Sequence, residues 1–569
     1  MPVEVVLGSP HEPPGDMYCP AARRARRVLF GRPRTAQVKR PTARPARTRR
    51  ASLGSTSMRG VARFLPGSSP RGGSGLEPVP ATDAAKRAED TGMATDQLAY
   101  LSAAELAAMI RSKAISASEV MRATLARAER VQAATNCFVT LCAEHALRDA
   151  AAADRRLAAG DDIGPLHGVP FHVKDLIDTA DVRCTFASLL FEHNVPHKDA
   201  VSIARLKQAG ALLMGKTTTP EFGHMPYTEA PLFGRTCNAW ASERTSGGSS
   251  GGAAVALAAG VCPLGVGTDA GGSTRIPAAA NGVVGLKQSA GLIPHDMAAE
   301  AFANVSSINP MSRTVLDAAL MLDAMAGPHS SDPYCQAPAA RGFAAAARRR
   351  GTLAGMRIAW RPLLANRVID GEVLALCESA AMTLAALGAE VELMDDDMEP
   401  VEPIWFAYSS ALWNARFRAV LPQWRDKMSP TLIKQMELGK DTTGEDLGKA
   451  LIARTRLYRN VQAWFERFDV VVTPTLSRTA LPIEERLFEP IEIDGRPVDT
   501  VRKAWYPYTH PFNLTGNPAL TLPCGVHGDG LPVAIQLVGR RGEDARLLSV
   551  AARFEEAKPW IGRKPSIFA

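Results

Sequence analysis

Two glycine- and serine-rich segments and one lysine are the parts of this chain whose residue types and spacing best suit chemistry. Residues 245–252 are TSGGSSGG, residues 267–277 are GTDAGGSTRIP, and Lys174 ends an apolar run that begins at Gly168. Glycines at this density weaken regular structure, so they suit positions where the backbone takes unusual dihedral angles or approaches a ligand closely. The serines beside them are candidate nucleophiles.

These segments do not match the common phosphate-binding or hydrolase motifs. Their glycines are not followed by the lysine of G-x-x-x-x-G-K-[ST], and they open no G-x-G-x-x-G unit. Ser273 lacks the surroundings of a G-x-S-x-G elbow. His193 and His197 have i,i+4 spacing, but Pro196 between them argues against a chelating pair on one helix. What remains is a serine nucleophile without histidine, and we expect no metal and no cofactor.

Lys174 is the candidate base for such a serine. A lysine accepts a proton only as the free amine, so its pKa of ~10.4 must fall by several units, which burial without an acidic partner achieves. Asp175 follows directly in the chain, and contact between the two side chains would oppose that fall. We therefore expect the side chain of Asp175 to point away from Lys174.

The sequence resembles the amidase signature family, whose members are serine hydrolases of carboxylic amides. The resemblance covers residues 101–555. Its most specific part is the double Ser/Gly block followed by a second Gly-Gly-Ser, with a lysine upstream. Matching segments are 168–175, 215–222, 247–277, 285–287, 513–519, 522–525 and 531–539.

The resemblance implies a Ser–Ser–Lys triad in which Ser273 is the nucleophile, Ser249 bridges on a cis peptide bond, and Lys174 is the base. It also implies an oxyanion hole of backbone N–H groups and a set of supporting residues, in which Asp269 is expected to be buried and paired with Arg275. The oxyanion donors would be Ala270, Gly271, Gly272 and Ser273, and the supporting residues Ser250, Thr268, Asp269 and Arg275.

From this resemblance we expect hydrolysis of a carboxylic amide to an acid and ammonia or amine, through an acyl-enzyme on Ser273. The family spans small aliphatic, aryl, fatty and oligomeric amides, and also the glutamine-hydrolysing component of a tRNA-dependent amidotransferase. That component stays an alternative, although residues 505–511 lack the acidic glutamine-binding position that it usually has late in the chain. Candidates for an apolar substrate pocket, or for ordinary packing, are Met225, Tyr227, Phe233, Trp405, Phe406, Tyr408 and Trp413.

The elements that must position these residues are predicted by capping signals and hydrophobic runs. Ser102 and Ser116 each begin a capping box, with Glu105 and Glu119 three residues later. Farther on, β-branched runs alternate with helical patterns, which indicates an α/β fold: a single large domain with a mixed β-sheet core covered on both faces by helices. The expected strands are 168–173, 211–215, 356–360, 390–393, 469–473, 519–522 and 533–538, and the expected helices include 201–209, 314–326, 372–387, 447–466 and 543–557.

Charge separates a leader from the body of this chain. The 569 residues carry a net charge of +8, but residues 1–92 alone hold 17 Lys and Arg against 7 Asp and Glu. The body is therefore close to neutral, and charge does not indicate an acidic partner for it. We expect residues 1–92 to be an Arg/Pro/Gly-rich disordered leader, translated from a start codon upstream of the true one at Met93, and residues 93–569 to be the amidase signature domain.

The expected partners and location follow from the remaining patterns. An Arg-rich arm at 1–92 is the one feature that suits nucleic-acid binding, a function of another class, but it has few aromatic residues for stacking, so we expect no nucleic-acid partner. Nine scattered cysteines without C-x-x-C indicate reduced thiols in a cytoplasmic protein. The most apolar run, residues 251–267, is short and Gly-rich, so we expect no membrane partner. The resemblance implies a small-molecule amide as the partner, and homodimers are common in the family, although the sequence leaves the oligomeric state open.

Overall fold

The computed structural model describes residues 95–335, 342–364 and 366–568. The expected leader and the start of the body at Met93 lie outside the described residues, so this division of the chain stays a prediction. Near the start of the described chain, α3 (Ala103–Arg111) and α4 (Ala117–Thr135) have the two capping boxes that the sequence predicts. In each, the N-cap serine accepts the backbone N–H of the glutamate three residues later, and that glutamate accepts the serine N–H.

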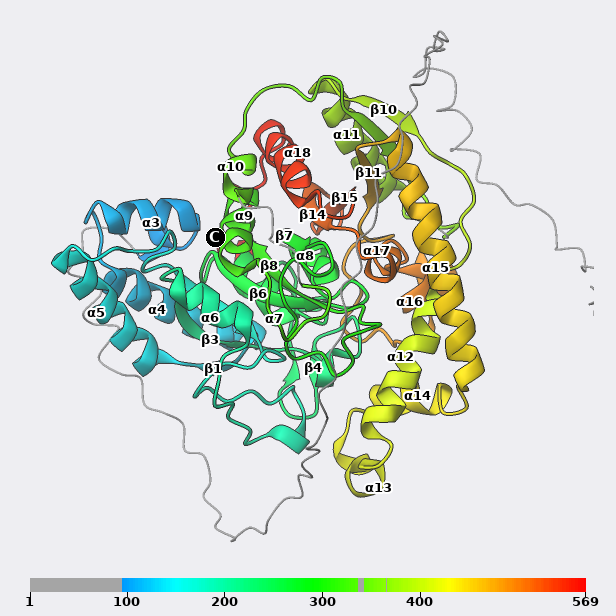
Figure 1. Cartoon of the computed structure of the whole chain (residues 1–569), viewed down its shortest axis with the longest axis horizontal. Helices are drawn as coiled ribbons and strands as arrows, with labels where there is room; N and C mark the ends of the chain where they lie inside the picture. Colours follow the sequence, from blue (N-terminus) through cyan, green and yellow to red (C-terminus); the bar gives the residue numbers. More distant parts are fainter. Residues whose placement is uncertain (1–94, 336–341, 365, 569) are drawn as a thin grey trace, which may run out of the picture. The chain divides into compact units, whose positions relative to one another are not determined.

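Eleven strands of the described chain form one mixed sheet in the order β1-β3-β2-β6-β8-β7-β14-β15-β11-β9-β10 (Figure 1). Strands β3, β2 and β6 are parallel neighbours, as are β11, β9 and β10, and the other pairs are antiparallel. All seven predicted strands are confirmed, one with the predicted ends (β10) and six with shifted ends, whereas β1, β6, β7 and β8 were not predicted. The strands are β1 (Phe138–Leu141), β2 (Pro170–Lys174), β3 (Leu212–Thr217), β6 (Leu264–Asp269), β7 (Val284–Lys287), β8 (Ser307–Ser312), β9 (Arg357–Trp360), β10 (Glu390–Leu393), β11 (Val470–Pro474), β14 (Ala519–Val526) and β15 (Pro532–Gly539).

The five predicted helices are also confirmed, as α6, α9, α11, α15 and α18. Four of the pocket candidates, Trp405, Phe406, Tyr408 and Trp413, lie on α12, which packs against both α14 and α15 (Figure 1). Besides α3 and α4, the α-helices of the described chain are α2 (Thr95–Leu98), α5 (Ala143–Ala159), α6 (Val201–Gln208), α7 (Gly251–Ala258), α8 (Arg275–Asn281), α9 (Val315–Met325), α10 (Phe343–Ala347), α11 (Gly371–Ala386), α12 (Glu402–Phe417), α13 (Leu421–Trp424), α14 (Pro430–Leu438), α15 (Gly444–Arg467), α16 (Val501–Ala504), α17 (His510–Thr515) and α18 (Asp544–Ala557).

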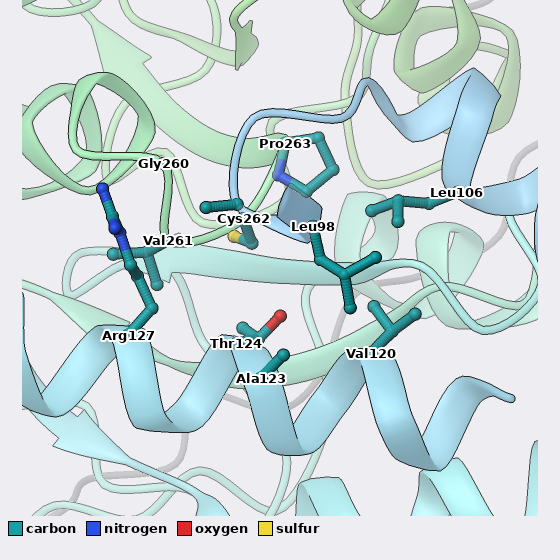
Figure 2. A pocket seen from close by; sticks show the side chains of 11 residues that line it. Leu98, Leu106, Val120, Ala123, Thr124, Arg127, Gly260, Val261, Cys262 and Pro263 are labelled. Carbon is teal, nitrogen blue, oxygen red and sulfur yellow. The ribbon is translucent and has the colours of Figure 1, made fainter. Parts of the chain in front are cut away.

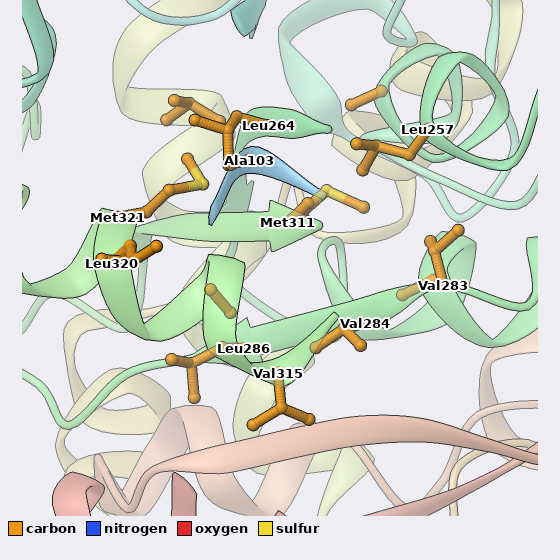
Figure 3. Packing of buried hydrophobic residues seen from close by; sticks show 14 of the residues in the cluster. Ala103, Leu257, Leu264, Val283, Val284, Leu286, Met311, Val315, Leu320 and Met321 are labelled. Carbon is orange, nitrogen blue, oxygen red and sulfur yellow. The ribbon is translucent and has the colours of Figure 1, made fainter. Parts of the chain in front are cut away.

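The central strands β2, β3, β6, β7 and β8 are buried along their whole length. Burial of consecutive residues, which point alternately to opposite faces, requires cover on both faces of a sheet. Figure 3 shows part of this core, in which strand side chains meet those of α7 and α9: Leu264, Val284, Leu286, Met311, Leu257 and Met321. The predicted fold class, a single large α/β domain with a mixed sheet, is confirmed.

A small cavity lies between α4 and the turn that follows α7 (Figure 2). Its volume is about 10 Å³, which leaves room for no more than one water molecule. Arg127 closes one side, because its Nε donates to the carbonyl of Ala259 at 2.9 Å. None of the predicted site residues lines it, so this cavity is a feature of packing.

Candidate active site

The ends of β2 and β6 bring the predicted site residues together. These strands are parallel neighbours, so their carboxyl ends lie at the same edge of the sheet, with Val173 paired to Val266. β2 ends at Lys174 and β6 ends at Asp269. Helices α7 and α8 begin directly after the two serine segments. Sheet topology thus places a lysine and both serine segments in one region.

Lys174 is fully buried, and its hydrogen-bond partners in the described chain are hydroxyl groups. Its Nζ donates to Ser249 Oγ at 2.7 Å and to Thr268 Oγ1 at 2.9 Å. Burial disfavours the charged ammonium and lowers the pKa of Lys174 well below its ordinary value, although the negative charge of Asp269 acts in the opposite direction. Burial therefore favours the free amine, which is the form that can accept a proton.

Asp175 points away from Lys174, as the sequence analysis expects. Its Oδ2 accepts hydrogen bonds from the backbone N–H and the hydroxyl of Thr185 at 3.1 and 2.5 Å, and its Oδ1 lies 3.8 Å from Lys216 Nζ. Burial raises the pKa of Asp175, and the charge of Lys216 acts to lower it. A second buried lysine therefore balances this carboxylate. The sequence analysis did not identify Lys216, although it lies within the matching segment 215–222.

The first serine segment adopts the expected geometry. The peptide bond between Gly248 and Ser249 is cis. The backbone N–H of Ser250 donates to the carbonyl of Ser273 at 3.1 Å, and Ser250 Oγ lies 3.3 Å from the carbonyl of Thr268. Ser250 thus connects the first serine segment to both the end of β6 and the second serine segment.

Ser273 is half-buried, whereas Lys174 and Ser249 are buried. Of these three residues, the candidate nucleophile Ser273 is therefore the one that is partly exposed. In the described part of the chain, no hydrogen bond joins the hydroxyls of Ser249 and Ser273.

The candidate oxyanion hole differs from the expected one at a single residue. The N–H of Gly272 donates to Asp269 Oδ1 at 2.7 Å, so the protein itself already uses this donor. The backbone N–H groups of Ala270, Gly271 and Ser273 donate to no other group among the described residues. The candidate hole therefore reduces to these three donors.

Asp269 and Arg275 form the expected buried pair. Arg275 donates to both carboxylate oxygens, from Nη2 at 2.9 Å and from Nε at 3.0 Å, and both side chains are fully buried. Asn513 and Gln536 accept two further guanidinium hydrogens, at 2.6 and 2.7 Å. Burial alone would raise the pKa of Asp269, but the charge and hydrogen bonds of Arg275, together with Asn513, lower it overall.

The sequence analysis did not identify Asn513 or Gln536 as site residues. The signal in the sequence that could have identified them is their position in the matching segments 513–519 and 531–539. Their amides bring α17 and β15 into contact with the loop that carries Ser273.

Two further side chains hold the loop that carries the oxyanion donors. Trp405 Nε1 donates to the carbonyl of Ala270 at 2.7 Å, and Thr509 Oγ1 donates to the carbonyl of Gly271 at 2.6 Å. Because a peptide unit is planar, the bond to the Ala270 carbonyl also fixes the N–H of Gly271, a candidate oxyanion donor, and the bond to the Gly271 carbonyl fixes the N–H of Gly272, which donates to Asp269. Trp405 is therefore one of the pocket candidates that lies at the site. Phe233 instead packs against Arg183, whose guanidinium carbon lies 6.0 Å from the centre of the Phe233 ring.

The described part of the chain offers no candidate metal centre. In the described chain, no cluster of three or more His, Cys, Asp or Glu side chains could hold a metal ion. None of its helices is both long and apolar enough to cross a membrane. The eight cysteines within the described ranges are free thiols.

The fold and the site together define an α/β protein with a serine–lysine centre in place of one built on histidine. A family model described as Amidase matches residues 119–548. The chain belongs to the amidase signature family of amide hydrolases.

Relatives and solved structures agree over most of the chain. An acylamidase of Rhodococcus erythropolis is 38% identical over 480 residues, covering 83% of this chain and 99% of its own length. The A component of the glutamyl-tRNA(Gln) amidotransferase of Thermosynechococcus vestitus is 34% identical over 488 residues, covering 81% and 99%. A bacterial aryl acylamidase structure superposes with a TM-score of 0.76 at 27% identity, covering 82% and 97%.

The lowered pKa of Lys174 predicts the pH dependence of catalysis. Only the neutral amine accepts a proton, so kcat/KM is expected to rise with pH, about tenfold per unit, until the pKa of Lys174 is passed. The buried imidazoles near the site do not account for such a rise above pH 5, since burial lowers the pKa of His224 to about 4 and that of His510 to about 3. Initial rates on an amide from pH 5 to 10 would measure this limb.

Lys287 provides the matched control for this profile. It is a third fully buried lysine, its pKa is lowered by burial to about 7, and its Nζ donates to the carbonyls of Gln288 and Asn517. The variant Lys287→Gln is expected to keep the position of the acid limb. If the acid limb moves or disappears in Lys287→Gln, the limb is due to Lys287 and not to Lys174.

Proposed function

We propose that this chain hydrolyses a carboxylic amide through an acyl-enzyme on Ser273. The observation that carries the proposal is the buried amine of Lys174, 2.7 Å from Ser249 Oγ and paired with hydroxyls rather than with a carboxylate. A lysine kept neutral in this way supplies the base that a serine nucleophile needs.

The reaction begins with attack of Ser273 Oγ on the amide carbonyl carbon. Ser249 accepts the proton of Ser273 while it gives its own to Lys174 Nζ. The carbonyl oxygen becomes an oxyanion, and the N–H groups of Ala270, Gly271 and Ser273 are the donors that stabilise it; one such donor is worth about 3 kcal/mol.

Collapse of the tetrahedral intermediate then breaks the C–N bond. The proton held on Lys174 returns through Ser249 to the leaving nitrogen, which departs as ammonia or amine. A water molecule then attacks the carbonyl carbon of the resulting ester, and its proton passes through Ser249 to Lys174. The acid leaves and Ser273 recovers its hydroxyl hydrogen.

Acylamides are the substrate class that we favour. It is supported by the acylamidase relative at 38% identity and by the aryl acylamidase structure. Trp405 contacts the loop that carries the oxyanion donors, which suits an apolar acyl or aryl group. Glutamine hydrolysis within a tRNA-dependent amidotransferase is less well supported, because residues 505–511 contain no acid to bind the glutamine amino group.

Labelling with a fluorophosphonate probe tests the nucleophile. We expect intact-mass spectrometry to show one adduct on the wild type and none on Ser273→Ala, because the probe reacts with an activated serine hydroxyl. An unlabelled wild type, or a labelled Ser273→Ala variant, would contradict the proposal.

Ser331 is the matched control for this labelling. It is the exposed serine whose Oγ lies 2.7 Å from His329 Nδ1, so it has a basic neighbour but no oxyanion loop. The variant Ser331→Ala is expected to keep the adduct in full.

A further inference from the structure

Two buried polar side chains, joined through Trp405 to the oxyanion loop, keep hydrogen-bonding atoms without a partner among the described residues. These atoms are Nε2 of Gln435 and Nε of Arg502. Gln435 is fully buried, and Arg502 is 6% exposed. A buried donor without a partner is costly, so such groups are uncommon in proteins and call for an explanation.

The orientation of the Gln435 amide follows from its neighbour. Arg502 Nη2 lies 3.2 Å from Gln435 Oε1. A guanidinium group only donates hydrogen bonds, so the oxygen of the amide must face Arg502. The NH₂ group therefore faces away from Arg502, with both of its hydrogens free.

This pair is connected to the catalytic centre by two sets of contacts. The guanidinium of Arg502 lies over the ring of Trp405, 4.8 Å from its centre, and Trp405 donates to the carbonyl of Ala270. On the other side, Thr431, one helical turn before Gln435 on α14, is hydrogen-bonded to His224 at 2.7 Å. The loop of His224 also covers Ser249, since a Cβ on Gly223 would lie 3.1 Å from Ser249 Oγ.

The charges around this pair are balanced. Glu402 lies 3.6 Å from Arg502, so one carboxylate already compensates the guanidinium. The imidazoles of His224 and His510 are neutral near pH 7, because burial lowers the pKa of each. The surroundings therefore offer free N–H donors without excess positive charge. This combination suits an uncharged acceptor better than a carboxylate, which would add an unpaired negative charge.

We propose that Gln435 and Arg502 form a specificity subsite that binds an uncharged oxygen acceptor, such as a ketone, amide or ether oxygen, carried by the substrate beside its scissile amide. The inference rests on the proposed function, because it assigns this role within the same active site. It predicts that the enzyme prefers amides with such an oxygen over isosteric amides without one.

Matched substrates test this subsite on both sides of the scissile bond. Hexananilide is compared with its 4-oxo and 5-oxo derivatives, and the hexanoyl amide of 3-ethylaniline with that of 3-methoxyaniline. We expect the wild type to show about a tenfold higher kcat/KM for the oxygen-bearing member of at least one pair. Equal rates within every pair would overturn the proposal, as would a preference for the corresponding glutaric acid monoanilide.

The variant Gln435→Glu isolates the free donor. It keeps the shape of the side chain and an oxygen for Arg502, but it replaces the free NH₂ with an acceptor. The preference, which is the ratio of kcat/KM for the oxygen-bearing substrate to that for the oxygen-free one, is expected to fall by about tenfold. The exposed Glu437→Gln on the same helix is the control and should keep the preference.

Fluorophosphonate labelling distinguishes a failure of the subsite from a failure of the proposed function. If Gln435→Glu is labelled at the wild-type rate and the preference is unchanged, the subsite is wrong while the proposed function stands. If the wild type is not labelled, the proposed function itself fails.

Discussion

Replacing Lys174 by methionine is expected to lower kcat/KM for amide hydrolysis by about 10⁴-fold or more. The lysine amine is the only base in contact with Ser249, at 2.7 Å, among the described residues, so its loss leaves the serine hydroxyls without a proton acceptor. Methionine has similar length and no charge, and it suits a position that is fully buried. Steady-state kinetics on an anilide, with circular dichroism to confirm folding, would measure the effect.

Ser273→Ala is expected to cause a loss of the same size, and the double variant no further loss. Residues that act as one unit are not additive, because the first substitution already removes what the second would remove. Losses that multiply in the double variant would show that Lys174 and Ser273 act independently, and this would contradict the relay through Ser249.

The stability of the Lys174 variant should change in the opposite direction from its activity. The pKa of Lys174 is lowered in the fold, so between that value and about 10.4 the unfolded chain binds more protons than the folded one. The folding free energy lost by keeping this amine neutral in the folded state therefore increases as pH falls below about 10.4. Lys174→Met is expected to have the higher unfolding midpoint at pH 7, with the difference narrowing toward pH 10.

Arg275→Met is expected to lower the free energy of unfolding by about 3–5 kcal/mol, the largest stability effect we predict. The substitution leaves the carboxylate of Asp269 fully buried without its guanidinium partner. It also frees the amides of Asn513 and Gln536 from the hydrogen bonds that join α17 and β15 to the loop of Ser273. Urea unfolding at pH 7 would measure the change.

The double variant Asp269→Asn with Arg275→Met should recover part of this loss, because it removes the buried charge. The pKa of Asp269 is lowered in the fold, so the stability due to the pair is present above about pH 3.9 and is lost as pH falls below it. The exposed pair of Lys449 and Glu445 is the control, and Lys449→Met should cost no more than about 0.5 kcal/mol. A similar cost for both pairs would contradict the importance of burial.

The features that the sequence predicted correctly depend on short-range patterns. The capping boxes at Ser102 and Ser116 join residues three positions apart, so they are visible in any window of the chain. The same is true of the β-branched runs of β9, β10 and β11, whose apolar residues cluster within a few positions. By contrast, β8 has the sequence SINPMS, and its serines, asparagine and proline hide a strand that long-range pairing with β6 imposes.

The residue types of the candidate centre are present in the sequence, and the resemblance to the amidase signature family assigns Ser249, Ser273 and Lys174 to it. Which groups they touch was decided only by the tertiary structure. The partner of Asp175 is Lys216, the Gly272 N–H is used by Asp269, and Gln536 reaches Arg275 across 261 positions of the chain. Contacts at such separations depend on how the sheet brings distant strands side by side, and no local pattern records that.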